Sequence, residues 1–430
     1  MSLSTETILD PWPAPRATAP VDVSVQLPGS KSLTNRALLL AAIADGPSTV
    51  VRALRSRDTL LMADALTALG CTVDTSGEDW HVVPGLDPEH VAERTVDCGL
   101  AGTVMRFVPP VAALAAGSTS FDGDPHMRNR PVGAMLDGLR ALGVTVEDEG
   151  RGALPFTVRG DGTVPGGQVV IDASASSQFI SALLLAGARY AHGVDIVHRG
   201  APVPSLPHIE MTVELLRAHG VQVDDSEKDR WTVAPGVVRA KDHVVEPDLS
   251  NAAPFLALAA VSGGRVVVEG WPEHTTQAGD TLRDVLTRMG CQVRFVPGGL
   301  EVVGTGRLQG VDLDLHDHGE LAPAIAALCA LAETPSRLTG IAHIRGHETD
   351  RLAALATELN SLGSDVDELP DGLVIRPAHL HGGVFHTYAD HRMAHAGVII
   401  GAAVDGVLVE NVGTTSKTFT DFAPFWAGLF

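Results

Sequence analysis

Aromatic residues are scarce in this chain of 430 residues: they make up 4% of it, whereas hydrophobic residues as a whole make up 45%. We therefore expect cores built from Ala, Leu, Val and Ile, and at this length two or three domains. No apolar run is as long as a membrane span, so we expect no membrane partner. Residues 1–20 lack the basic region and apolar stretch of a signal peptide and are predicted to form a mobile Pro/Ala extension.

Cysteine is also rare. The chain has four cysteines, Cys71, Cys98, Cys291 and Cys329, and they lie far apart with no CxxC pair. This pattern favours reduced thiols in a cytoplasmic protein over a disulfide framework or a zinc site.

Basic residues are fewer than acidic ones, 31 Lys and Arg against 52 Asp and Glu, so the formal net charge is −21. Such a charge argues against nucleic acid or an anionic membrane as a partner. An acidic protein that binds anions must gather its few cations in one place. Only four lysines are present, and two of them, Lys31 and Lys417, fall within the motifs described below.

The stretch PGSKSLTNRALLL, residues 28–40, joins a Gly-containing turn to an apolar helical run. It brings Lys31, Ser32 and Arg36 to the start of a helix, where Ser32 or Thr34 could form the cap. Cations and hydroxyls beside a helix N-terminus favour phosphate or carboxylate. The alternative for this stretch alone is an ordinary capped helix with a solvated basic turn.

A repeat runs through the whole chain. An amphipathic helix followed by Gly, two residues and Val occurs five times, with the glycines about 70 to 77 residues apart at Gly70, Gly143, Gly220, Gly290 and Gly363. Each copy is typical of a helix C-cap followed by a strand. A second, more apolar helix alternates with it in six copies, so we predict six α/β units of roughly 70 residues.

The sixth unit ends without the strand that usually follows its second helix. The segment Val21–Leu27 alternates as a strand does, and we predict that it fills this vacancy. Three units would then form a first domain, residues 28–245. The other three, residues 246–430 together with 1–27, would form a second domain.

The uncommon polar residues gather at the predicted helix starts instead of along helix faces. If all repeats point their helix N-termini the same way, these residues converge on one interdomain cleft suited to a polyanionic ligand. The helix starts contain Lys31, Ser32, Arg36, Gly102, Thr103, Arg106, Arg130, Ser176, Ser177, Gln178, Ser205, His208, Asp248, Asn251, Glu320, Glu348, Arg351, Asp390, His391, Arg392 and Lys417.

Individual members of this set have simpler interpretations. Glu348 and Arg351 have the spacing of a surface ion pair. His391 and His395 are four residues apart, as zinc ligands can be, but no third ligand is evident and we expect no metal. GxGxxG and P-loop patterns are absent, which argues against an ordinary nucleotide site.

The motifs PGSKSLTNRALLLAA, AGTVMRF, the RP of RNRPV, SSQF, HETDRL, ADHRMA and the Lys of TTSKTF occur in this order. Together they closely resemble the 5-enolpyruvylshikimate-3-phosphate synthase family, from about Val21 to the C-terminus. The resemblance implies a two-domain inside-out α/β fold of six βαβαββ repeats, three per domain, with the active site in the interdomain cleft.

The resemblance also implies the reaction: the enolpyruvyl group of phosphoenolpyruvate moves to the 5-hydroxyl of shikimate 3-phosphate, and phosphate leaves. It further implies a place in the shikimate pathway and inhibition by glyphosate. Shikimate 3-phosphate would be bound by Lys31, Ser32, Arg36, Ser176, Ser177, Ser205, Glu320 and His347. Phosphoenolpyruvate would be bound by Lys31, Gly102, Arg130, Gln178, Arg351, Arg392 and Lys417.

The chemistry needs a base for the hydroxyl proton and an acid for the enol CH₂. By resemblance, Glu320 takes the first role, and Glu348 handles the methylene proton with help from Lys31. Supporting roles fall to Thr103, Arg106 and His391. No metal or organic cofactor is expected, and we expect a cytoplasmic monomer.

Four residues depart from the family pattern. Glu320 stands where Asp is common, Leu100 where Asn is common, and His208 where an aromatic hydroxyl is common. His347 replaces a common Lys, so its donor capacity depends on its tautomer or charge.

Two other functions are alternatives to this prediction. A sister enolpyruvyl transferase acts on UDP-N-acetylglucosamine, but it usually carries a reactive Cys in the loop that here reads FDGDPHMRNRP. A non-catalytic polyanion-binding module would be favoured if the carboxylates were missing, but Glu320 and Glu348 are both present.

Overall fold

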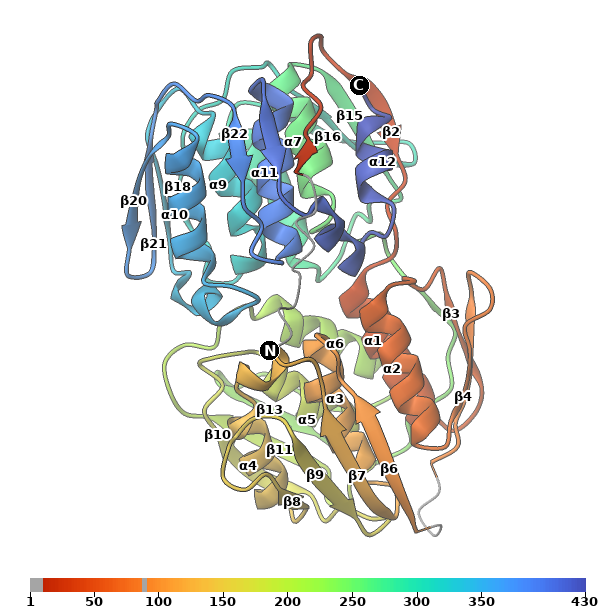
Figure 1. Ribbon diagram of the computed structural model, residues 1–430. Coiled ribbons are helices and arrows are strands. Elements are labelled where there is room, and N and C mark those ends of the chain that lie inside the picture. Colours follow the sequence, from red (N-terminus) through yellow and green to blue (C-terminus); the bar gives the residue numbers. More distant parts are fainter. Residues whose placement is uncertain (1–10, 87–90) are drawn as a thin grey trace, which may run out of the picture. The chain divides into compact units, whose positions relative to one another are not determined.

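The computed structural model describes residues 11–86 and 91–430. The chain divides into two compact units. The first unit is Pro28–Pro247, and the second unit is Asp248–Phe430 together with the N-terminal segment that ends at Leu27. Each unit is described separately below (Figure 1).

The first unit contains three four-stranded sheets, with strand orders β14-β3-β5-β4, β6-β7-β9-β8 and β10-β11-β13-β12. Its strands are β3 (Ser48–Val51), β4 (Thr72–Asp74), β5 (Trp80–Val83), β6 (Ala92–Asp97), β7 (Gly117–Asp122), β8 (Thr145–Glu147), β9 (Phe156–Gly160), β10 (Gly167–Ile171), β11 (Val194–His198), β12 (Val223–Asp224), β13 (Arg230–Val233) and β14 (His243–Val244). Its helices are α1 (Lys31–Ile43), α2 (Arg57–Ala68), α3 (Gly102–Ala112), α4 (Gly133–Ala141), α5 (Gln178–Gly187) and α6 (Pro207–Ala218), with the 3₁₀ turn η1 (Met127–Asn129).

The second unit contains two four-stranded sheets, β16-β17-β15-β2 and β18-β19-β21-β20, and one three-stranded sheet, β1-β23-β22. Its strands are β1 (Trp12–Pro13), β2 (Asp22–Val25), β15 (Arg265–Glu269), β16 (Gln292–Val296), β17 (Gly299–Val303), β18 (Asp312–Asp314), β19 (Ser336–Thr339), β20 (Asp365–Leu369), β21 (Gly372–Arg376), β22 (Gly383–Phe385) and β23 (Val407–Val409). Its helices are α7 (Ala253–Ser262), α8 (Leu282–Arg288), α9 (Ala322–Ala330), α10 (Arg351–Ser361), α11 (His391–Ala403) and α12 (Phe422–Ala427), with η2 (Ala278–Thr281), η3 (Gly319–Leu321), η4 (Ala342–Gly346) and η5 (Val412–Lys417).

One connection pattern recurs in both units. In the second repeat the order along the chain is β6-α3-β7-α4-β8-β9, and β6 lies parallel to β7 while β7, β9 and β8 pair antiparallel. This confirms the βαβαββ repeat. The five glycines that marked it all follow the second helix of a repeat with φ between 77° and 107°, a region that only glycine adopts at low cost.

The strand predicted to complete the sixth repeat lies elsewhere, so that prediction was wrong. Within Val21–Leu27, β2 pairs in parallel with β15 and forms the first strand of the fourth repeat. The last repeat instead takes β1, which pairs antiparallel with β23. The pairing of β2 with β15 buries Val25. The edge of the sheet β1-β23-β22 is completed by only the two residues of β1.

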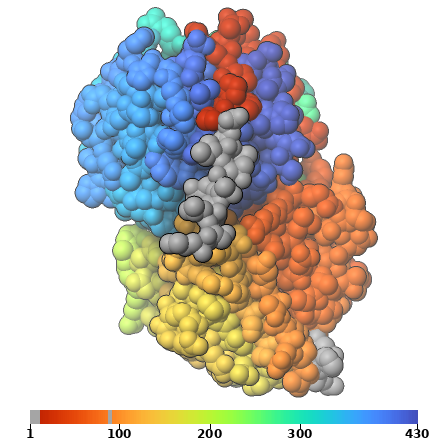
Figure 2. Space-filling view, in the orientation of Figure 1, coloured from red at the N-terminus to blue at the C-terminus, as the bar shows by residue number. Residues whose placement is uncertain are grey.

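The segment expected to be a mobile extension is therefore partly ordered. Trp12 and Pro13 pair with Val409 and Leu408. Figure 2 shows the N-terminal residues, in red, at the surface beside the blue C-terminal elements of the same unit. The first ten residues lie outside the described part of the chain.

The first helix of each repeat is the centre of its core. All residues of α9 are buried, and α11 is buried from His391 to Ala402. In α1, three successive leucines, Leu38 to Leu40, are buried. A helix enclosed on all sides can place polar residues cheaply only at its ends, where free N–H groups need partners. Among the described residues, none of the helices is both long and apolar enough to cross a membrane.

Candidate active site

Lys31 opens α1, and the helix cap is Ser30 instead of the predicted Ser32 or Thr34. The Ser30 hydroxyl accepts the Leu33 N–H at 3.4 Å, while the Thr34 hydroxyl accepts the Leu54 N–H at 3.0 Å. Lys31 Nζ lies 3.1 Å from the buried Asp58 carboxylate in the first turn of α2. This ion pair fixes the ammonium group at the start of α1.

Arg36 is almost fully buried and connects α1 to α6. Its Nε donates to the Thr212 hydroxyl at 2.8 Å, its Nη2 to the His208 carbonyl at 3.0 Å and its Nη1 to the Ser32 carbonyl at 3.1 Å. The guanidinium also stands over the Phe107 ring, 5.0 Å from its centroid. Arg36 thus holds Ser32 and the start of α6 in fixed positions.

Two guanidinium groups meet at the N-terminus of α3. A Cβ on Gly102 would lie 3.2 Å from Arg130 Nη1 and 3.3 Å from Arg106 Nη1. Arg106 Nη1 donates to Gln178 Oε1, at the start of α5, over 2.6 Å. Burial and the neighbouring Arg130 lower the pKa of Arg106 well below its ordinary value. Like charges held this close favour an anion between them.

The remaining predicted residues of the first unit lie at neighbouring helix starts. Ser176 Oγ accepts the Gln178 N–H at 3.3 Å, and Ser177 is buried directly before α5. Ser205, just before α6, has a φ of 57°, a left-handed conformation that is uncommon outside glycine.

Hydrogen bonds join these helix starts to one another. Asn35 in α1 donates to the Thr103 hydroxyl in α3 at 2.7 Å. The Arg106–Gln178 bond joins α3 to α5, and Arg36 joins α1 to α6. The first unit therefore brings its predicted site residues together.

Glu348 is the centre of the predicted site in the second unit. Its Oε1 lies 2.5 Å from Lys417 Nζ, and its Oε2 lies 2.9 Å from His391 Nδ1. Burial alone would raise the pKa of Glu348, but His391 and Lys417 outweigh burial and hold that pKa well below its ordinary value. Glu348 is thus a carboxylate, and His391 Nδ1 carries the hydrogen that it accepts.

Arg351, three residues after Glu348, forms a bidentate ion pair with Asp390. Nε and Nη2 of Arg351 donate to the two Asp390 oxygens at 2.8 and 3.0 Å, and both side chains are buried. Burial lowers the pKa of Arg351, but the Asp390 carboxylate outweighs it and raises the pKa above its ordinary value. Asp390 also caps α11 by accepting the Arg392 N–H at 2.8 Å.

His347 and Glu320 complete the second set. Arg351 Nη1 lies 3.1 Å from His347 Nδ1, and since arginine can only donate, this nitrogen accepts. Glu320 Oε1 accepts the Ser250 hydroxyl at 2.5 Å. The predicted residues of the second unit thus lie around the starts of α10 and α11 and beside the segment that precedes α7.

Two residues that contact the predicted site were assigned no role by the sequence analysis. Asp58, the partner of Lys31, sits in SRDT and has the pattern of an ordinary helix start. Asp390 stood among the polar helix starts but was given no role, although it pairs with Arg351. Both are acidic residues whose partners are distant in sequence, so the only signal was a carboxylate at a helix start.

One cluster among the described residues has the proximity that a metal ion needs: Glu348, Asp390 and His391, with ligand atoms within 4.8 Å of one another. Its carboxylate oxygens, however, already contact Lys417, Arg351 and His391. A dication would have to compete with two side-chain cations, so these residues do not fit a metal site.

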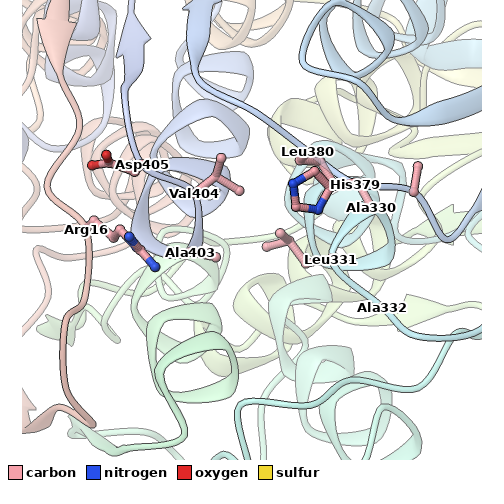
Figure 3. A pocket seen from close by; sticks show the side chains of 10 residues that line it. Arg16, Ala330, Leu331, Ala332, His379, Leu380, Ala403, Val404 and Asp405 are labelled. Carbon is pink, nitrogen blue, oxygen red and sulfur yellow. The ribbon is translucent and has the colours of Figure 1, made fainter.

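A surface pocket of about 330 Å³ lies on the second unit (Figure 3). It lies at the C-terminal ends of α9 and α11, near Ala330 and Ala403. Arg16, His379 and Asp405 also line it. None of the predicted site residues contributes to this pocket.

Comparison with known proteins identifies the family. A family model for EPSP synthase (3-phosphoshikimate 1-carboxyvinyltransferase) matches residues 15–426. A 3-phosphoshikimate 1-carboxyvinyltransferase of Kocuria rhizophila is 56% identical over 430 residues, covering 98% of this chain and 96% of that protein. The chain belongs to the EPSP synthase family. It is a transferase of the shikimate pathway.

Solved structures support the fold. An EPSP synthase from Acinetobacter baumannii has a TM-score of 0.78 at 23% identity, covering 98% of this chain and 96% of that one. The enolpyruvyl transferase NikO from Streptomyces tendae has a TM-score of 0.72 at 17% identity, covering 96% of both chains. The predicted two-domain enolpyruvyl transferase fold is confirmed.

The ionisation of Glu348 predicts a pH-dependent effect of Glu348→Gln. Because its pKa is lowered on folding, the carboxylate stabilises the protein above the unfolded pKa of about 4.3, and this stability is lost as pH falls through the lower folded pKa. We expect the variant to melt below the parent protein at pH 7, with the gap narrowing below about pH 4. Thermal melts of both proteins between pH 7 and about pH 3 test this prediction. A difference in melting temperature that does not change with pH would contradict the ionised state of Glu348.

Proposed function

We propose that the helix starts of the two units together bind phosphoenolpyruvate and shikimate 3-phosphate and transfer the enolpyruvyl group to the 5-hydroxyl. Both substrates carry a phosphate and a carboxylate, so their site needs several cations. Each unit supplies such cations at helix N-termini, where free N–H groups add to the positive potential. The observation that carries the proposal is Glu348, a carboxylate held between Lys417 and His391 beside the Arg351–Asp390 pair.

Shikimate 3-phosphate would be held mainly by hydroxyl and cationic groups of the first unit. Buried hydrogen bonds from Arg36 to Thr212 and His208 hold the starts of α1 and α6 in fixed positions. On the second unit, His347 accepts from Arg351 through Nδ1, so in its neutral form it offers an Nε2–H donor to the acceptor. The full set is Lys31, Ser32, Arg36, Ser176, Ser177, Ser205, Glu320 and His347.

Phosphoenolpyruvate would lie among guanidinium groups and the two active-site lysines. Arg106 and Arg130 meet beside Gly102, so they can bind an anion of the donor. Arg351 is oriented by Asp390, and planar guanidinium groups bind carboxylate and phosphate in a bidentate fashion. The set is Lys31, Gly102, Arg130, Gln178, Arg351, Arg392 and Lys417, supported by Thr103, Arg106 and His391. Glyphosate, also an anion, would compete for this set.

The reaction requires three proton transfers, and at C2 of phosphoenolpyruvate one C–O bond forms while the C–O bond to phosphate breaks. Glu320 takes the proton of the 5-hydroxyl as its oxygen attacks C2 of phosphoenolpyruvate, while the CH₂ group gains a proton to become a methyl group. The resulting tetrahedral intermediate then loses a methyl proton and phosphate, which leaves the enolpyruvyl ether. Glu348, with Lys31, handles the proton at the methyl carbon.

The protonation state of Glu348 determines in which step of the reaction it can act as a base and in which as an acid. As a carboxylate it is ready to remove the methyl proton in the second step but must first gain a proton to act in the first. A bound anionic substrate would add negative charge near Glu348 and compete for Lys417. Both effects raise the pKa of a neighbouring carboxyl group, so substrate binding would favour the protonated form.

We also propose that the protein acts as a cytoplasmic monomer, since its small anionic substrates require no partner chain or membrane.

Phosphate release from phosphoenolpyruvate tests the proposal, with shikimate 3-phosphate and UDP-N-acetylglucosamine as alternative acceptors. We expect release with the first acceptor only. Glu348→Gln and Lys31→Ala should each lower kcat by roughly 100-fold or more, as loss of acid–base groups does. Glu149→Gln, on an exposed carboxylate, serves as the matched control.

Release with UDP-N-acetylglucosamine alone would retain the donor site but overturn the acceptor. Folded protein that releases phosphate with neither acceptor would favour a polyanion-binding module. Full activity of Glu348→Gln would refute the role of this carboxylate.

Gly102→Ala should weaken binding of phosphoenolpyruvate while leaving shikimate 3-phosphate binding intact. The added methyl group would lie 3.2 to 3.3 Å from Arg130 and Arg106, so both guanidinium groups must shift by a few tenths of an ångström. We expect the KM for phosphoenolpyruvate to rise about five- to twentyfold. Steady-state kinetics with each substrate varied in turn will measure this, and an unchanged KM would place the donor elsewhere.

A further inference from the structure

The segment that leads into α11 has a strained backbone. Tyr388 and Ala389, the two residues before Asp390, have φ values of 54° and 57°. Left-handed conformations are costly for residues other than glycine, and two in succession persist only when the surroundings enforce them. Asp390 and Arg392 follow at once, so the strain lies directly beside the predicted donor site.

A carboxylate on α10 holds this segment in place. Glu358 is 2% exposed, and its Oε1 accepts the Tyr388 hydroxyl at 2.6 Å. Its Oε2 accepts the His386 N–H at 2.9 Å. Both oxygens of a buried carboxylate are thus directed at the segment, although Tyr388 is 43% exposed.

The same helix contacts the segment at a second place. Arg351 and Glu358 are seven residues apart, about two turns, and therefore share a face of α10. Arg351 binds Asp390, while Glu358 binds Tyr388 and the backbone of His386. The strained residues lie between these two attachments.

We propose that Glu358 and Tyr388 are positioning residues for phosphoenolpyruvate binding. They keep Tyr388 and Ala389 in their left-handed conformation. This conformation fixes the position of Asp390, which orients Arg351 and caps the helix that carries Arg392. The proposal rests on the proposed role of Arg351 and Arg392 in binding the donor. Neither Glu358 nor Tyr388 is required to touch a substrate.

Tyr388→Phe tests the proposal because it removes a single hydrogen bond and keeps the shape of the side chain. For Tyr388→Phe we expect the KM for phosphoenolpyruvate to rise about fivefold, while kcat and the KM for shikimate 3-phosphate change less than about twofold. Glu358→Gln should have a smaller effect, since the Gln oxygen can still accept the His386 N–H and its amide N–H can donate to the Tyr388 oxygen.

Tyr190→Phe is the matched control. Tyr190 is buried in the first unit, and its hydroxyl donates to the Pro110 carbonyl at 3.0 Å. It should lower the melting temperature without changing either KM. If Tyr388→Phe likewise lowers only the melting temperature, its hydrogen bond merely stabilises the fold and the proposal is overturned.

Ala389→Gly in the Tyr388→Phe background tests the strain itself. Glycine adopts φ values near 57° at little cost, so the double variant should regain part of the lost affinity for phosphoenolpyruvate. A KM that stays at the Tyr388→Phe value would overturn the role of the left-handed conformation.

Arg351→Lys, measured in the same assay, separates this proposal from the proposed function. Lysine keeps the charge but not the bidentate geometry, so the KM for phosphoenolpyruvate should rise. If Arg351→Lys raises it and Tyr388→Phe does not, the positioning proposal fails alone. If Arg351→Lys leaves it unchanged, the donor site itself is wrong.

Discussion

The buried Asp390 carboxylate is the group on which the second unit's site depends. It is fully buried and accepts hydrogen bonds from Nε and Nη2 of Arg351. It also caps α11 by accepting the Arg392 N–H. Loss of one partner of such a pair would leave the other charge buried and uncompensated. Because His391 follows Asp390 directly and contacts Glu348, the same carboxylate also sets the position of the proposed acid–base group.

The fold explains why the predicted site residues gather at helix ends. The central helices of the repeats, such as α9 and α11, are buried along their length and can carry polar groups cheaply only where free N–H groups await partners. In the first unit the cations Lys31, Arg36 and Arg106 are each fixed by a neighbouring helix. A chain whose net charge is −21 thus holds these few cations at helix starts, where the proposed anion site lies.

Much of this organisation could be predicted from sequence, because it rests on local signals. A glycine such as Gly143 is needed wherever a helix ends in the left-handed region, so its recurrence showed the repeat. Motifs at helix starts likewise pointed to Glu348 and Arg351, and the structure shows both residues in ion pairs. Contacts between segments distant in sequence leave weaker signals. The pairing of β2 with β15 and the ion pair between Lys31 and Asp58 are contacts of this kind, and neither was predicted. A two-residue strand such as β1 has no periodicity to detect.

The most direct test of this account compares Asp390→Asn with Asp350→Asn in the steady-state KM for phosphoenolpyruvate. Both aspartates cap a helix and pair with an arginine, but the Asp350 side chain is 43% exposed and that of Asp390 is 0% exposed. We predict a rise of at least about thirtyfold for Asp390→Asn, because Arg351 loses its charged partner, and less than about threefold for Asp350→Asn. Equal effects of the two substitutions would contradict the central role of the Asp390–Arg351 pair.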